Sequence, residues 1–224
     1  MSIAVNLAKV RERMAAAAQL AGRLPGEVTL VAVAKGYGPE AILEAYRAGQ
    51  RDFGESRAQE LVEKASQLPP DIRWHFVGPL QRNKVREVRS WVVLLHSLDR
   101  LALARSWARG VGVPPPVLVE VNVGGEGQKL GTPPDTAEEL VERATREGLD
   151  VQGLMTIPPR VARPEEARPY FLELAVLRDR LALRWPELRH LSMGMTEDFE
   201  VAVEAGSTML RIGRAIFQEV QEAR

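Results

Sequence analysis

The sequence predicts an α/β protein, a (β/α)8 TIM barrel with one extra helix before the first strand. Eight expected strands are each followed by a helix-like segment, and this alternation is typical of parallel strands joined by helical crossovers. Eight such units within 224 residues fit the small end of the size range of this barrel. No Ser/Gly-rich linker interrupts the chain, so we expect one domain over residues 1–224. An open doubly wound sheet is the competing architecture.

The extra helix and four strand–helix units occupy the first half of the chain. Residues 3–21 have an amphipathic pattern that Gly22 ends. The expected core contacts of this helix are Val5, Val10, Met14 and Leu20. Strands are expected at 28–34, 51–53, 73–77 and 91–96. Helices are expected at 39–48, 56–66, 83–89 and 100–109, and Gly49 closes the first of them.

The second half continues the same alternation. Three consecutive prolines at 114–116 form a stiff connector into an apolar strand at 117–121. Further strands are expected at 151–155, 188–192 and 208–212. Helices are expected at 135–146, 164–183 and 197–204, and a last helix follows the eighth strand.

Composition narrows the classes of function. Thirty basic residues balance 30 acidic ones, so overall charge does not favour nucleic acid or an anionic membrane as a partner. The absence of cysteine excludes disulfides and thiolate chemistry and fits a reducing compartment. The N-terminus lacks the pattern of a signal peptide, and no apolar run approaches the roughly 20 residues of a transmembrane helix. We therefore expect a cytoplasmic protein.

Lys35 is the first candidate for chemistry. It ends the most apolar strand-like run of the chain, at a position that we expect to be partly desolvated. Desolvation disfavours the ammonium form of a lysine and frees its amine as a nucleophile, which a Schiff-base lysine requires. The choice of residue is informative because the chain has 25 arginines and only five lysines. The alternative is a strand-end lysine that simply extends into solvent.

Two glycine turns predict a phosphate site. Gly194 follows the seventh strand and Gly213 follows the eighth, and each turn leads into a helix. Backbone N–H groups at such turns bind anions, and the loops after strands seven and eight of these barrels most often hold phosphate. Each turn alone could serve only tight packing. Together with Lys35 on the neighbouring first strand, they indicate a ligand that carries both a phosphate and an aldehyde.

Pyridoxal 5′-phosphate (PLP) has that pair of groups. Arg211 then has a candidate role, because an arginine beside the pyridine nitrogen keeps that nitrogen unprotonated and weakens the ring as an electron sink. A structural ion pair at the barrel mouth is the alternative for Arg211.

Other motifs give weaker signals. His75 lies between Trp74 and Phe76 and is expected to be a hydrogen-bonded core residue. Three histidines without cysteine predict no metal site. Neither GxGxxG nor GxxxxGK[ST] occurs, so no dinucleotide or ATP site is predicted.

Several segments, in order along nearly the whole chain, resemble one known family. The segments span residues 31–35, 53–55, 74–84, 121–123, 128–131, 153–158, 191–198 and 205–217. Among them are Trp74-His75-Phe76-Val77-Gly78-Pro79-Leu80-Gln81 and Ser192-Met193-Gly194-Met195-Thr196-Glu197. The chain is similar to the pyridoxal phosphate homeostasis proteins, also called the YggS or PROSC-like PLP-binding proteins.

The resemblance implies a PLP-binding barrel like the N-terminal domain of alanine racemase. Lys35 aligns with the lysine that forms the internal aldimine, and Arg211 aligns with the arginine that faces the pyridine nitrogen. The implied phosphate-binding residues are Ser192, Gly194 and Met195 after strand seven, and Gly213 and Arg214 after strand eight. The family is thought to carry and buffer PLP, so no catalytic residue is expected and PLP-dependent apoenzymes are possible partners.

The chain departs from the family pattern at three places. Ser56 replaces the usual asparagine after Phe53-Gly54-Glu55, which puts a cofactor contact from that position in doubt. Gly36-Tyr37 replaces a polar pair after Lys35, and Gln218 replaces a glycine.

Two other functions share parts of this pattern. A PLP-dependent amino-acid racemase needs acid–base groups on both faces of its ligand, and alanine racemases take one from a separate β-domain. This sequence ends one helix after its eighth strand, so we expect that domain to be absent. A Schiff-base aldolase would use the lysine and the phosphate loops without PLP. We expect a monomer, because no oversized apolar helix face stands out.

Overall fold

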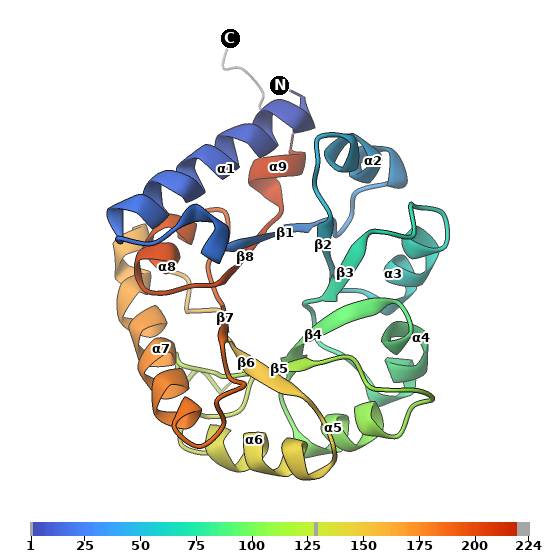
Figure 1. The fold of residues 1–224 in the computed structure, drawn as a ribbon, viewed down its shortest axis with the longest axis vertical. Helices are drawn as coiled ribbons and strands as arrows, with labels where there is room; N and C mark the ends of the chain where they lie inside the picture. Colours follow the sequence, from blue (N-terminus) through green and yellow to red (C-terminus); the bar gives the residue numbers. More distant parts are fainter. Residues whose placement is uncertain (1, 128–129, 219–224) are drawn as a thin grey trace.

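A closed barrel of eight parallel strands forms the centre of the computed structural model, which describes residues 2–127 and 130–218 (Figure 1). The strands follow one another around the barrel in chain order, and β1 pairs with both β2 and β8, as in Ala32↔Phe53 and Leu30↔Leu210. This closure confirms the predicted (β/α)8 barrel and excludes the open sheet. Gln128 and Lys129, within one of the matching segments, lie outside the described residues.

The strands are short, as the strands of such barrels are. Their bounds are β1 Thr29–Val33, β2 Asp52–Glu55, β3 Arg73–Phe76, β4 Val92–Leu98, β5 Val117–Glu120, β6 Val151–Met155, β7 His190–Ser192 and β8 Met209–Ile212. Every predicted strand is present, and the sixth has the predicted ends. The strand expected at 51–53 continues to Glu55, because its ladder with β3 runs on through Gly54↔His75 and Glu55↔Phe76.

The helices surround the barrel (Figure 1). Their bounds are α1 Ile3–Leu20, α2 Pro39–Arg47, α3 Ala58–Ala65, α4 Val85–Arg89, α5 Leu101–Ala108, α6 Ala137–Arg146, α7 Arg168–Ala182, α8 Phe199–Glu204 and α9 Arg214–Phe217. Short 3₁₀ turns at Pro25–Glu27, Arg82–Lys84 and Pro164–Ala167 precede β1, α4 and α7. The helices predicted at 83–89 and 164–183 therefore each begin with a 3₁₀ turn, and their α-helical parts start at Val85 and Arg168. Within the described ranges, no helix is long and apolar enough to cross a membrane.

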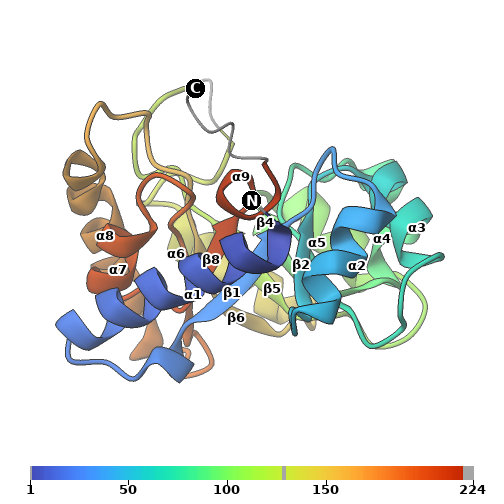
Figure 2. The same cartoon turned by 90° about the horizontal axis from the view of Figure 1, so that it is seen from above.

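The additional helix α1 lies on the outside of the barrel against α8 and α9 (Figures 1 and 2). Its buried stripe contains Leu7, Val10, Met14, Ala17 and Ala18, which confirms two of the four predicted core contacts. The other two predictions are wrong, because Val5 and Leu20 are 45% and 83% exposed. At 100° per residue, both lie about 140–160° away from Leu7 around the helix axis.

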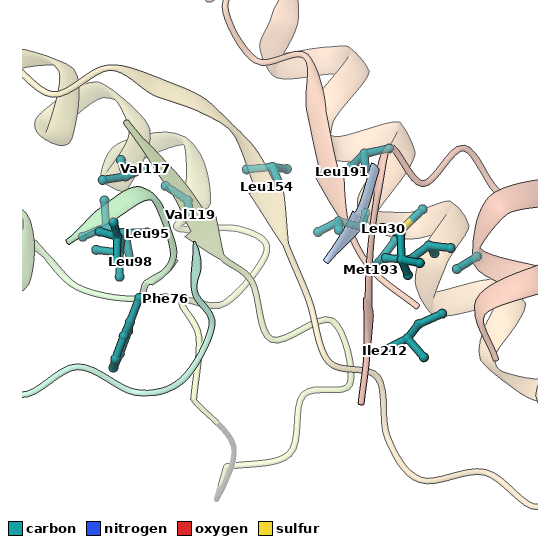
Figure 3. Close-up of a cluster of buried hydrophobic side chains, with 14 of the residues drawn as sticks. Leu30, Phe76, Leu95, Leu98, Val117, Val119, Leu154, Leu191, Met193 and Ile212 are labelled. Atoms are coloured by element: carbon teal, nitrogen blue, oxygen red, sulfur yellow. The ribbon is translucent and has the colours of Figure 1, made fainter. Parts of the chain in front are cut away.

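Two separate apolar clusters fill the fold. The larger one packs the outward side chains of the strands against the helices, and Figure 3 shows part of it, including Leu95, Val119 and Leu191. The smaller one contains Leu94, Leu118, Met155 and Met209, which come from four different strands. Successive side chains of a strand point to opposite faces, so this second set lies inside the barrel. The same inward positions carry buried polar side chains such as His96 and Arg211.

Candidate functional site

The carboxyl ends of β1, β7 and β8 meet at one edge of the barrel. Val31 pairs with Arg211 across β1 and β8, and a Cβ added to Gly213 would lie 3.0 Å from the carbonyl oxygen of Val33. On the other side of β8, the backbone N–H of Arg211 donates to the carbonyl of Gly194 at 3.0 Å. The strand ends that carry Lys35 and the two glycine turns are therefore neighbours, as the sequence predicted.

Lys35 lies in the turn that follows β1 and is exposed. The expectation of partial desolvation is wrong, because burial ends at Ala34 and the chain turns at Gly36, whose φ of 78° is a left-handed conformation. The apolar run before Lys35 indicates that β1 is buried, but it does not indicate that the lysine itself is buried. Its amine is therefore open to a ligand at the mouth of the barrel.

A second lysine, Lys64 on α3, holds the backbone on both sides of Lys35. Its Nζ donates to the carbonyl of Ala34 at 2.8 Å and to carboxylate oxygens of Glu55 at 2.5 Å and Glu60 at 2.8 Å. The same Glu60 oxygen accepts the backbone N–H of Gly36 at 3.1 Å. The sequence analysis missed this cluster, although Glu55 belongs to a matching segment.

The cluster is strongly charged and largely removed from water. The side chains of Lys64 and Glu55 are 7% and 0% exposed. The hydrogen bond from Lys64 is the main cause that lowers the pKa of Glu60 to about 2, and Arg57 and the N–H of Gly36 act in the same direction. Glu60 is therefore ionised at neutral pH and keeps its contact with the turn that carries Lys35.

Gly194 makes the first turn possible. Its φ of 96° is unfavourable for residues with a side chain, and a Cβ there would lie 2.5 Å from that of Ala202 and 2.9 Å from a methyl group of Leu210. The next N–H, that of Met195, donates to the carboxylate of Asp198 at 2.6 Å. Burial raises the pKa of Asp198 from its ordinary value. A ligand phosphate at this N–H would compete with a carboxylate.

The second turn is tied to the first. Gly213 precedes α9, and the exposed side chain of Arg214 forms an ion pair with Glu197 at 3.0 Å. The backbone N–H of Ala215 donates to the hydroxyl of Thr196 at 3.4 Å. Both predicted phosphate turns thus lie side by side, with the guanidinium of Arg214 at their outer edge.

Arg211 and Ser192 lie below these turns, inside the barrel. Arg211 donates from Nη1 to Oγ of Ser192 at 2.6 Å and from Nη2 to the carbonyl of Thr156 at 2.8 Å. Ser192 is fully buried and its Oγ also lies 2.8 Å from Nδ1 of His96. The hydroxyl of Ser192, predicted in the phosphate loop, is thus engaged in the interior.

The ion-pair alternative for Arg211 finds no support. Across the described residues, no carboxylate lies within ion-pair distance of its guanidinium, and its Nε donates no hydrogen bond. Burial lowers the pKa of Arg211 to about 10, opposed by the more distant charges of Glu120 and Asp198. Arg211 is therefore a charged donor at neutral pH, and the two hydrogen bonds to Ser192 and Thr156 use only two of its five N–H groups.

His75 is buried and hydrogen-bonded to Asp52 and His96, which confirms its prediction as a core histidine. The hydroxyl of Ser56 is buried without a partner among the described residues, beside Gly78. Among the described residues, Ser56 makes its polar contact through the backbone N–H, which donates to the carboxylate of Glu55 at 2.6 Å, and not through its hydroxyl. The asparagine of the family pattern is larger than this serine.

Glu120, at the end of β5, is a further buried acid that the sequence analysis missed. Burial raises its pKa from 4.5 to about 7, helped by Asp99 and opposed by Arg211. The folded protein binds this proton more tightly than the unfolded chain does. The contribution of Glu120 is therefore most favourable below about pH 4.5 and is lost as the pH rises through 7.

Glu120→Gln should remove this pH dependence. We expect the free energy of unfolding to rise by roughly 2 kcal/mol relative to the unsubstituted protein at pH 8, because a neutral amide replaces a buried charge, and to change little at pH 4.5. Urea unfolding at the two pH values measures the difference. An equal effect of the substitution at both values would contradict the assignment.

Comparison with known proteins identifies the family. The model of the alanine racemase N-terminal domain matches residues 5–220. A pyridoxal phosphate homeostasis protein of Aquifex aeolicus is 44% identical over 225 residues, which cover 98% of this chain and 99% of that protein. Its counterpart in Escherichia coli is 41% identical and covers 96% of this chain and 95% of its own length. The chain belongs to the family of pyridoxal phosphate homeostasis proteins.

Similar solved structures have the same barrel. PipY of Synechococcus elongatus, in a structure described with PLP bound, superposes with a TM-score of 0.81 at 32% identity, over 96% of this chain and all of that one. Alanine racemase of Corynebacterium glutamicum has a TM-score of 0.70 at 14% identity and is 62% covered, which shows the shared fold alone. The barrel and the family implied by the resemblance are both confirmed.

Proposed function

We propose that this protein binds PLP at the carboxyl end of its barrel and takes part in PLP homeostasis, holding PLP without turning over a substrate. The observation that carries the proposal is the meeting of an exposed amine, Lys35, with two glycine turns and the buried guanidinium of Arg211. The names of the relatives and the PLP-bound PipY structure support the choice of ligand.

Lys35 supplies the covalent link in this proposal. Its unprotonated Nζ adds to the aldehyde carbon of PLP, a C=N bond forms, and the aldehyde oxygen leaves as water, so no oxidant or reductant is needed. Lys64 and Glu60 hold the peptide groups that flank Lys35. The amine therefore extends from a fixed point of the backbone.

The phosphate is proposed to bind at the two turns. Gly194 and Met195 belong to the first turn, which Ser192 at the end of β7 precedes, and Gly213 and Arg214 belong to the second. Backbone N–H groups and a guanidinium are strong donors to phosphate oxygens. The absence of a side chain at Gly194 and the exposure of Arg214 suit this role.

Arg211 is proposed to face the pyridine nitrogen. A guanidinium with a pKa of about 10 keeps its proton at neutral pH, so it donates a hydrogen bond and leaves the pyridine nitrogen without a proton. When bound, PLP promotes amino-acid chemistry because its ring withdraws electrons. A ring whose pyridine nitrogen is unprotonated withdraws them weakly. This arrangement favours retention of PLP over turnover.

The wider setting is part of the same proposal. We infer one PLP-binding domain over residues 1–224, acting as a cytoplasmic monomer that supplies PLP-dependent apoenzymes. The equal numbers of basic and acidic residues and the absence of cysteine support this setting.

Absorbance spectra of the purified protein with PLP test the proposal. We expect an imine band that is absent with pyridoxine 5′-phosphate, which has an alcohol in place of the aldehyde but the same phosphate. An aldolase that uses the lysine without PLP would leave the spectrum of PLP unchanged. Absence of the imine band would refute the proposal.

A chiral assay separates a carrier from a racemase. The PLP-loaded protein is incubated with L-alanine, and D-alanine is measured against a Lys35→Ala control. We expect no D-alanine above that control. Measurable inversion would establish the racemase instead.

A further inference from the structure

A continuous line of hydrogen bonds crosses the interior of the barrel. It begins at Asp52 on β2 and passes through His75 on β3, His96 on β4 and Ser192 on β7 to Arg211 on β8. The successive distances are 3.1, 2.9, 2.8 and 2.6 Å. His75, His96, Ser192 and Arg211 are all at most 4% exposed. Sequence analysis assigned no role to Asp52 or His96.

Asp52 fixes one end of this line. Burial alone would raise its pKa, but hydrogen bonds with His75 and Arg73 outweigh burial and lower the pKa to about 2. The group is therefore a carboxylate, which can only accept hydrogen bonds. The Nε2 atom of His75 must carry the hydrogen that lies between them.

The direction of the remaining bonds follows. Burial is the main cause that holds the pKa of His96 well below its ordinary value, and the charge of Arg211 acts in the same direction, so this ring is neutral and carries one N–H. With a single ring hydrogen, on Nε2, His75 has a bare Nδ1 that accepts from Nε2 of His96. The bare Nδ1 of His96 then accepts the hydroxyl hydrogen of Ser192.

The oxygen of Ser192 is thereby turned toward Arg211. With its own hydrogen donated to His96, Oγ presents a lone pair to Nη1 of Arg211. The carbonyl of Thr156 holds Nη2, so both terminal nitrogens of the guanidinium are fixed. The reverse direction would require hydrogen on both ring nitrogens of His75, which would add a second cation to the barrel interior beside Arg211.

We propose that Asp52, His75 and His96 are positioning residues that orient the Ser192 hydroxyl and, through it, the guanidinium of Arg211. The role toward PLP rests on the proposed function, whereas the direction of the bonds is a property of the protein without ligand. The charged and titratable groups near this line, besides its own members, are Arg73, His190, Glu120 and Asp198. A buried line of hydrogen bonds makes the surrounding structure rigid only when every polar atom in it has a partner.

Nitrogen NMR of the ligand-free protein tests the direction. The chain has only three histidines, so long-range ¹H–¹⁵N spectra of the ring nitrogens assign simply from single substitutions. Near pH 7.5 we expect His75 and His96 both to carry hydrogen on Nε2 and to have a bare Nδ1. Hydrogen on Nδ1 of His96 would overturn the proposal, and the tautomers themselves are read from the unsubstituted protein.

Asp52→Asn removes the group that sets the direction, because an amide both donates and accepts. We expect the signals of His75 and His96 to shift toward a mixture of tautomers, with those of His190 unchanged. Arg73→Met is the matched control, since it removes the other partner of Asp52, an ion pair of 2.6 Å, and leaves the carboxylate. Equal shifts in both variants would contradict the role of the carboxylate.

A double-mutant cycle tests whether the line of hydrogen bonds affects the binding of PLP. We expect Asp52→Asn to weaken PLP binding by about threefold to tenfold, the worth of one hydrogen bond. In a Ser192→Ala background, where the line is cut, the same change should have less than a twofold effect. Equal weakening in both backgrounds would overturn the proposal. A protein that binds no PLP at all would instead refute the proposed function, and the tautomers would still be measured independently.

Discussion

Lys64→Met is expected to destabilise the protein by about 3–5 kcal/mol, because it leaves the carboxylate of Glu55 buried without its cation. That carboxylate is 0% exposed and lies 2.5 Å from Nζ of Lys64. Urea unfolding measures the free energy. Lys84→Met is the matched control, since Lys84 pairs with Glu87 at the surface, where both side chains are 42% exposed. It should change the free energy by no more than about 1 kcal/mol.

The double substitution Lys64→Met/Glu55→Gln refines this test. Neutralising the stranded carboxylate should recover a large part of the lost stability. If Lys64→Met costs less than about 1 kcal/mol, the cluster is not the buried ion pair described here.

Lys35→Ala should abolish the imine absorbance with PLP and leave the fold intact. The amine is the group that forms the C=N bond, and no other residue can replace it at the end of β1. Because Lys35 is exposed, its loss should change the free energy of unfolding by no more than about 0.5 kcal/mol. Absorbance titration with PLP measures the first effect, and urea unfolding the second.

Lys84→Ala is the control for this prediction. It removes a lysine that lies after β3, away from the two glycine turns, and whose side chain is 42% exposed, and it should leave the imine band unchanged. A band of full intensity in Lys35→Ala would mean that another lysine holds the ligand.

The fold followed from local signals. All eight strands lie where the sequence predicts them, and glycine or proline residues marked the ends of several helices. Regular alternation of strands and helices then indicates a parallel sheet with helices outside. Errors arose where a residue's environment depends on distant segments. The face of α1 is set by α8 and α9, so Val5 and Leu20 were misassigned.

The sequence predicted which residues lie together at the mouth of the barrel, but it did not predict how deeply each of them is buried. Strand ends placed Lys35, Gly194, Arg211 and Gly213 together, because the carboxyl ends of parallel strands meet at one edge. The exposure of Lys35 and the interior hydroxyl of Ser192 depend on the three-dimensional packing. The cluster of Lys64 and the line of hydrogen bonds from Asp52 to Arg211 join residues that are distant in the sequence. Asp52 and Arg211 are 159 positions apart, and no spacing pattern reveals such contacts.

Borohydride trapping tests the central claim, that Lys35 holds PLP, most directly. Borohydride reduces a lysine imine to a stable amine, so the protein is saturated with PLP, reduced, digested and analysed by mass spectrometry. The account predicts one pyridoxyl group per chain, located on Lys35 and absent from Lys35→Ala. A pyridoxyl group located mainly on Lys9, Lys64, Lys84 or Lys129, or no modification after saturation with PLP, would contradict it.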